Sequence, residues 1–164
     1  MAFLTDIVES WRRPARVVRR HLDRGQSEPF AFTLLLAFLI LAFVAQWPGV
    51  ARVTAQTPEV PIAPQLLAIA MAVLATIPLW YTLAAAGRVV ARAMGGRGSW
   101  YGARVALFWA LDAVSPLVLL AGLVAGLIGP GVQLTAIGAI TFAVFIVFWF
   151  ANLRETERGQ PEWT

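Results

Sequence analysis

The chain contains no cysteine, no lysine and only one histidine in 164 residues. Without cysteine it has neither structural disulfides nor thiolate metal sites. Charged residues make up only 13% of it, about half the share in a typical globular domain. A soluble domain of this length has a large surface to cover with polar groups, and this chain has too few of them. These absences exclude an ordinary soluble protein.

What the chain has in abundance is apolar sequence, at 59% of its residues and a mean hydropathy of +0.72. A bilayer core needs roughly 20 apolar residues per spanning helix. We therefore predict an all-α, polytopic integral membrane protein with four transmembrane helices, preceded by an amphipathic interfacial segment at residues 1–29. The transmembrane domain covers residues 30–153 and a short tail follows at 154–164. The four spans are predicted at about 30–47, ending at Pro48-Gly49, and at 66–87, 105–128 and 132–151.

The arginines orient these spans, because cytoplasmic loops near helix ends retain basic residues. Six arginines fall in residues 1–29, four in residues 88–104 and two after residue 151, whereas the 48–65 loop holds only Arg52. Twelve of the thirteen thus lie on one side of the membrane. We predict a multi-pass protein with both termini cytoplasmic.

The N-terminal segment has the pattern of two short helices. Asp6-x-x-Glu9 is typical of a capping box that starts a helix, and Pro14 can open a second one. In the second, Val17, Val18 and Leu22 share one side while arginines take the other. His21 is interpreted as one more polar residue of the charged side, because a lone histidine without ligand partners is weak evidence for a metal site.

An amphipathic, arginine-bearing segment beside a span suggests a helix lying among lipid headgroups, where guanidinium groups pair with phosphates. The alternative, given equal weight, is that these arginines only set the topology. The candidate headgroup contacts are Arg12, Arg13, Arg16, Arg19, Arg20, Arg88, Arg92 and Arg97.

A glycine-rich stretch, Gly95 to Ser99, separates the second and third spans. Glycines beside arginine can form an anion-binding nest, but a tight interhelical turn is the favoured interpretation. The stretch matches neither a phosphate loop nor a dinucleotide fingerprint. Nucleic acid is not an expected partner, because no basic domain outside the membrane is large enough to present a recognition surface.

The motif Gly-Gly-Arg-Gly-Ser-Trp at 95–100, followed by Gly-Ala-Arg at 102–104, resembles the Yip domain, the membrane module named for Ypt/Rab-interacting proteins. The leader Glu-Ser-Trp-Arg-Arg-Pro at 9–14, together with Pro78 and Pro116, resembles the short bacterial members. The resemblance implies a polytopic helical protein with a cytoplasmic N-terminus, here in a bacterial inner membrane, that is often found in complexes with other membrane proteins.

This chain departs from the family pattern in two respects. Family members usually have five spans where four are predicted here, and the long soluble N-terminal region of the eukaryotic proteins is missing. The eukaryotic role in vesicle trafficking through Rab GTPases is therefore not carried over to this chain.

Asp112 is the only ionisable residue within a predicted span, and an intramembrane carboxylate is a functional candidate by default. Pro116 leaves the carbonyl of Asp112 without its helical donor. If spans two and three pack as an antiparallel hairpin, Pro78 lies at a similar depth, and the carbonyl of Leu74 and the hydroxyl of Tyr81 are expected neighbours, as are those of Thr76 and Thr82.

Two interpretations of Asp112 remain open. The functional one is a proton or cation site between two proline-broken helices. The structural one, which is favoured, is a protonated or hydrogen-bonded Asp112 that joins the third span to the second. A transport path usually needs more than one polar group, and these spans contain no second charge.

Gly122 and Gly126 are spaced to permit the close approach of another helix. Three partners are weighted equally: the fourth span, whose Ala136, Gly138 and Ala139 are also small, a second copy of the chain, or another protein.

An enzyme is the least supported class, because nucleophilic catalysis needs an activated serine, cysteine or lysine beside a base. No catalytic residue, cofactor or metal is predicted. The first hypothesis is a non-catalytic membrane protein of the Yip type that binds membrane lipids and either other membrane proteins or copies of itself. The alternatives are a small oligomeric proton-linked transporter or channel using Asp112, and an accessory subunit of a larger membrane complex.

Overall fold

The computed structural model describes residues 2–157, which form seven helices and, within that range, no strand. Four helical segments are long and apolar enough to cross a membrane, with α4 and α5 counted as one segment. The prediction of an all-α protein with four spans is confirmed. The helices are α1 (Ala2–Ser10), α2 (Pro14–Leu22), α3 (Glu28–Gln56), α4 (Ile62–Ala75), α5 (Ile77–Ala93), α6 (Trp100–Leu127) and α7 (Val132–Thr156).

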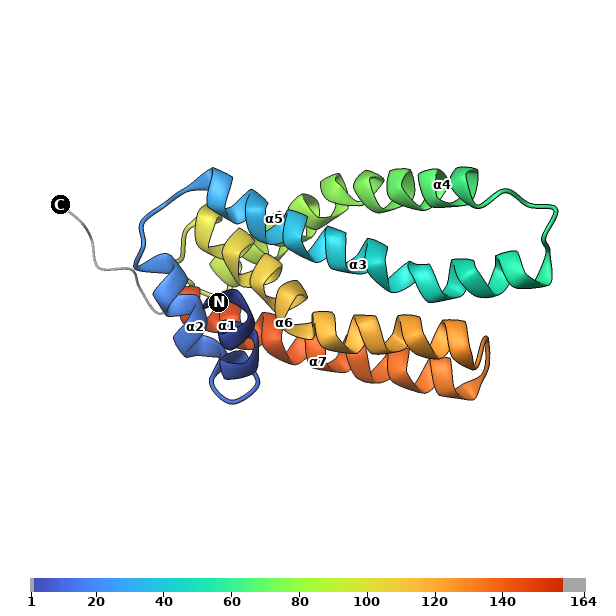
Figure 1. Ribbon diagram of the computed structural model, residues 1–164. Helices are drawn as coiled ribbons and strands as arrows, with labels where there is room; N and C mark the ends of the chain where they lie inside the picture. The colour runs from blue at the N-terminus through green and yellow to red at the C-terminus, as the bar shows by residue number, and fades with distance from the viewer. Residues whose placement is uncertain (1, 158–164) are drawn as a thin grey trace.

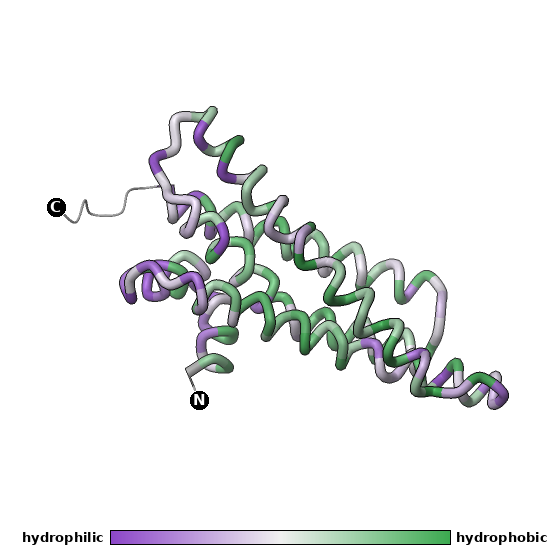
Figure 2. The backbone as a smooth tube through the Cα atoms, turned by 90° about the horizontal axis from the view of Figure 1, so that it is seen from above, coloured by the Kyte–Doolittle hydropathy of each residue, from purple (hydrophilic) through white to green (hydrophobic). Residues whose placement is uncertain are grey.

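The connections between the long helices gather at two opposite ends of the molecule (Figure 1). One end holds α1, α2, the α5–α6 link at residues 94–99 and the last residues of α7. We call it the Arg-rich end, because every arginine except Arg52 falls in or beside these segments among the described residues. The α3–α4 and α6–α7 links lie at the other end. Hydrophobic residues dominate the long helices between the two (Figure 2).

The core surrounds the first half of α6. Nearly every residue from Tyr101 to Ser115 is buried, including the large rings of Phe108 and Trp109. Helix α6 packs against α3, α5 and α7. Beyond Pro116 no residue of α6 is fully buried, and α4 has no buried residue along its whole length. Packing is therefore concentrated toward the Arg-rich end.

The expectation that the first span ends at Pro48-Gly49 is wrong, because α3 continues through Pro48 to Gln56. A proline inside a helix removes one hydrogen bond, which a helix packed among neighbours can tolerate. The effective stop is Thr57-Pro58, since the residue before a proline is disfavoured in helical conformation.

The second span is interrupted at Thr76, where α4 ends and α5 begins. Pro78 lies in the first turn of α5, where its missing N–H costs no helical bond. The Thr76 N–H donates to the Val73 carbonyl at 3.1 Å.

The capping-box prediction at Asp6 is also wrong. Helix α1 begins at Ala2, so Asp6 lies inside it rather than at its start. Side-chain caps occur instead at Ser27 and Ser99, whose hydroxyls accept from the N–H groups of Phe30 and Gly102. The sequence pattern failed because Asp6 is used in a tertiary contact, described below.

Candidate functional site

The two N-terminal helices dock on the bundle at its Arg-rich end. Helix α2 packs against α7 and α6, and α1 packs against α2 and α6. Val17 and Val18 are completely buried in the main core. The predicted amphipathic N-terminal segment is therefore present, and the apolar side of α2 faces protein rather than lipid.

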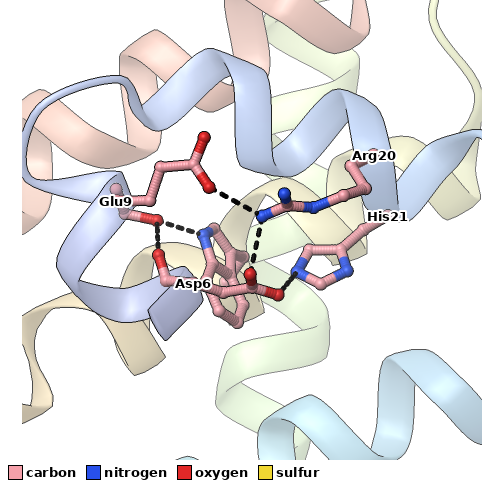
Figure 3. Close-up of polar contacts among 6 residues, drawn as sticks. Asp6, Glu9, Arg20 and His21 are labelled. Carbon is pink, nitrogen blue, oxygen red and sulfur yellow. Dashed lines mark hydrogen bonds and ion pairs between the residues drawn. The ribbon is translucent and has the colours of Figure 1, made fainter. Parts of the chain in front are cut away.

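A chain of polar contacts fixes this docking (Figure 3). The Arg20 guanidinium contacts the Asp6 carboxylate at 2.6 Å and the Glu9 carboxylate at 3.0 Å, which ties α2 to α1. The Ser10 hydroxyl donates to the Asp6 carbonyl at 2.8 Å and accepts from the Trp109 indole N–H at 2.9 Å. The network thus continues from the N-terminal helices into the centre of α6.

His21 is buried, with only 3% of its surface exposed, so its assignment to the charged side of α2 is wrong. Its ring lies 4.6 Å from the Trp109 ring and 5.4 Å from the Phe30 ring, centroid to centroid. Burial, with Arg24 and Arg20 nearby, lowers the pKa of His21 to about 4, although the Asp6 carboxylate opposes the shift. The imidazole is neutral at physiological pH. Within residues 2–157 no cluster of three or more metal-ligating side chains occurs.

Asp112 is fully enclosed in α6, and neither carboxylate oxygen has a hydrogen-bond partner within the described part of the chain. One turn of α6 away, Trp109 is bonded to Ser10, and the Trp11 indole N–H donates to the Ala113 carbonyl at 3.1 Å. The N-terminal segment therefore covers α6 on both sides of Asp112 in sequence.

The structure does not gather the predicted polar candidates around Asp112. Pro78 and Pro116 are exposed, and the Tyr81 ring packs edge-on against Phe108 at 5.3 Å. The hydroxyls of Thr76 and Thr82 donate to carbonyls of the preceding turn in their own chain segment. A hydrogen-bonded link from Asp112 to the second span is thus not formed by the described residues.

Gly122 and Gly126 face α3, which corrects the expected choice of partner. A Cβ on Gly122 would overlap the backbone of Ala45, and one on Gly126 would overlap Pro48. The two glycines therefore allow close contact between the first and third spans inside one molecule. The proposed contact with the fourth span, a second copy or another protein does not use this face.

The eight candidate headgroup arginines fall into two groups. Arg19, Arg20 and Arg88 form ion pairs with Glu155, Asp6 and Glu157 respectively, Arg20 also reaching Glu9. The other five are exposed at the Arg-rich end and form no ion pair with another described residue: Arg12, Arg13, Arg16, Arg92 and Arg97. Lipid contact by either group stays a prediction.

The sequence did not reveal the roles of two polar residues, one in the last turns of α7 and one just beyond its end. Asn152 is fully buried and donates its amide to the Ala106 carbonyl at 3.2 Å, an interaction that an asparagine at the end of an apolar run could have signalled. Glu157 reaches back to the α5–α6 link, where its carboxylate accepts from the Gly98 N–H at 2.6 Å. No local pattern predicts that contact, because the two residues are 59 positions apart.

These features define a polytopic helical membrane protein whose N-terminal helices are locked onto the spanning bundle. The Yip1 domain model matches residues 8–163, and the chain belongs to the Yip1 domain family. No curated protein and no solved structure shows significant similarity to it.

Proposed function

We propose that this protein is a non-catalytic scaffold of a bacterial inner membrane that binds anionic lipids and other membrane proteins, with both termini in the cytoplasm. The observation that carries the proposal is the pairing of two exposed surfaces. Five exposed arginines that form no ion pair with another described residue lie at the Arg-rich end, and α4 is an apolar span segment with no buried residue. The first suits lipid phosphates, and the second offers a helix face to lipid or to a neighbouring protein.

The test is purification of the full chain from native membranes under mild detergent, followed by crosslinking and mass spectrometry. We expect a defined partner or a stable oligomer, with crosslinks concentrated on α4, and anionic lipid that stays bound. A partner present at fixed stoichiometry would identify an accessory subunit. A strictly monomeric particle without associated protein would contradict the scaffold role.

A second candidate is a proton-linked transporter or channel, and the buried Asp112 carboxyl, which has no hydrogen-bond partner among the described residues, favours it. A carboxyl in a span normally has a partner or a transport role. In proteoliposomes this hypothesis predicts pH-dependent flux that the substitution Asp112→Asn abolishes. Equal flux from both proteins, or none from either, would reject it.

A further inference from the structure

A cleft opens at the Arg-rich end between α5 and α7. It has a volume of about 470 Å³, within the range of ligand sites. Its walls are largely apolar, and two of the wall residues, Met94 and Phe150, are 84% and 61% exposed. The described residues that line it include Val90, Met94, Gly96, Phe150, Arg154 and Glu157.

The polar end of this cleft is a seat for an anion. The Gly98 N–H donates to the Glu157 carboxylate, and Arg88 Nη1 lies 3.3 Å and 3.5 Å from its two oxygens. Arg88 is only 8% exposed, and its Nε has no hydrogen-bond partner within the described residues. A Cβ on Gly96 or on Gly98 would overlap the carboxylate, so the glycines make room for it.

Glu157 can leave this seat without disturbing a span, because it is the capping residue just beyond the last turn of α7. Removing it exposes a buried guanidinium and a free N–H to a second anion. Positive charge nearby is in excess, since Arg92, Arg97 and Arg154 are exposed. A planar guanidinium and a backbone N–H beside glycines suit a phosphate as well as a carboxylate.

We propose that the seat and the cleft together bind one anionic phospholipid, whose phosphate replaces the Glu157 carboxylate and whose acyl chain lies along Val90, Met94 and Phe150. The apolar wall singles out a phospholipid over a free anion, because inorganic phosphate would leave the wall unused. Glu157 is then an internal competitor that closes the seat when no lipid is bound. This inference rests on the lipid-binding part of the proposed function and names its site.

The proposal predicts that substitutions of the two ion-pair partners, Arg88 and Glu157, change lipid binding in opposite directions. The probe is dioctanoyl phosphatidylglycerol, added to the full chain in detergent micelles, with the bound fraction measured by native mass spectrometry. Glu157→Gln weakens the competitor and should tighten binding by about tenfold, whereas Arg88→Gln removes the main phosphate donor and should weaken it by about tenfold or more. Arg88→Lys keeps the charge without the planar fork and should give a smaller loss, which provides a second variant if Arg88→Gln does not fold.

Arg104→Gln is the matched control, because it breaks a different ion pair at the same end, between Arg104 and Glu28. It should leave lipid binding within about twofold. Millimolar inorganic phosphate should not displace the lipid, and dioctanoyl phosphatidylcholine should bind more weakly because its headgroup carries no net charge.

Several outcomes would overturn the inference. Weakening by both Arg88→Gln and Glu157→Gln, or no change in either, would show that the ion pair is purely structural. Displacement by inorganic phosphate would reduce the site to a free-anion seat. If neither the natural protein nor any variant binds the lipid while a protein partner still co-purifies, the lipid site is rejected and the scaffold role stands. If the lipid binds but no partner or oligomer is found, the lipid site stands and the scaffold role is rejected.

Discussion

At the scale of single residues, the glycines of α6 determine how close the first and third spans can lie. Gly122 and Gly126 allow backbone contact with Ala45 and Pro48, whereas Gly138 of α7 has no atom within 4 Å of the position of a Cβ. Small residues at a helix interface permit dispersion contacts that a larger side chain would prevent. Although all three glycines lie inside helices, Gly122 and Gly126 should not tolerate a larger side chain, whereas Gly138 should.

Gly122→Ala should destabilise the purified protein by about 1–3 kcal/mol, because the added Cβ must displace the backbone of α3. Gly138→Ala is the matched control and should be neutral or slightly stabilising, because alanine favours a helix more than glycine does. Thermal unfolding in the same detergent checks both. Equal loss from the two substitutions would contradict the assignment of α3 as the partner.

Single residues also show where sequence reasoning stops. The spacing of Gly122 and Gly126 predicted a helix contact, but several small-residue faces were available as partners and the sequence does not rank them. Asp6 and His21 were misassigned because each was judged from its own helix. Their environment is supplied by Arg20, Trp109 and the rest of a tertiary network that no local pattern contains.

At the scale of elements, α1 and α2 are joined to each other by the Arg20 ion pairs, and both contact α6, where His21 packs against Trp109. The pKa of His21 is about 4 in the docked state, against 6.5 for an exposed histidine. Protonation favours the undocked state, in which the histidine has its ordinary pKa. The contribution of neutral His21 to docking is therefore fully present above about pH 6.5. That contribution is lost as pH falls from 6.5 toward 4.

Between pH 7 and pH 5 the docking of α1 and α2 should lose about 2 kcal/mol. Hydrogen exchange of their backbone amides, corrected for the intrinsic rate at each pH, should show the loss of protection. In His21→Phe a ring remains between Trp109 and Phe30 but does not titrate, so protection should change much less with pH. An identical loss in both proteins would show that another group carries the pH dependence.

The end of α6 has its own cap, supplied by α3. Arg52 Nη1 lies 3.3 Å and 3.4 Å from the carbonyls of Gly126 and Leu127, the last residues of the helix. A cation at a helix C-terminus interacts favourably with the helix dipole and with carbonyls that lack a helical donor. Among the described arginines, the one outside the Arg-rich end therefore has a structural role.

Arg52→Gln should lower stability by about 1 kcal/mol, because two terminal carbonyls of α6 lose a charged donor. Arg92→Gln removes the same charge from an exposed position and should change stability by less than about 0.5 kcal/mol. Chemical unfolding of the two variants in one detergent gives the comparison. A larger effect at Arg92 than at Arg52 would contradict the capping role.

At the scale of the whole molecule, much of the architecture follows from composition. The four predicted apolar runs match the long helices, because a bilayer demands internally hydrogen-bonded segments about 20 residues long. Their ends were less predictable: α3 passes through Pro48, and α5 starts anew after Thr76. Proline removes a hydrogen bond wherever it falls, but packing decides whether the helix continues.

The candidate site was predictable only in its parts. The sequence identified Asp112 as the isolated carboxyl and favoured a tight interhelical turn over an anion-binding nest for the 95–99 stretch. The cover that α1 and α2 place over α6, and the Glu157 carboxylate that occupies the turn, depend on contacts between distant segments. Such contacts are set by the packed structure and leave no periodic signal.

The predicted topology can be tested directly because the natural chain has no cysteine. Single substitutions Gln26→Cys and Glu59→Cys place a thiol at exposed positions on opposite ends of the bundle. If the protein lies in a bacterial inner membrane as proposed, a membrane-impermeant maleimide added to intact spheroplasts should label Glu59→Cys at once and Gln26→Cys only after permeabilisation. The reason is that arginine-rich segments near helix ends favour the cytoplasmic side. The reverse pattern would invert the proposed orientation.

The interruption at Thr76 divides the second span into two halves with different mechanical roles. Helix α5 is held against α6, whereas α4 is in contact mainly with α3 and has no buried residue. A change in bilayer thickness is accommodated by tilting the helix that resists least. We therefore expect α4 to pivot about Thr76 in thinner or thicker membranes. The thickness of the leaflet around α4 would set the tilt of this helix, while the Arg-rich end would keep its shape.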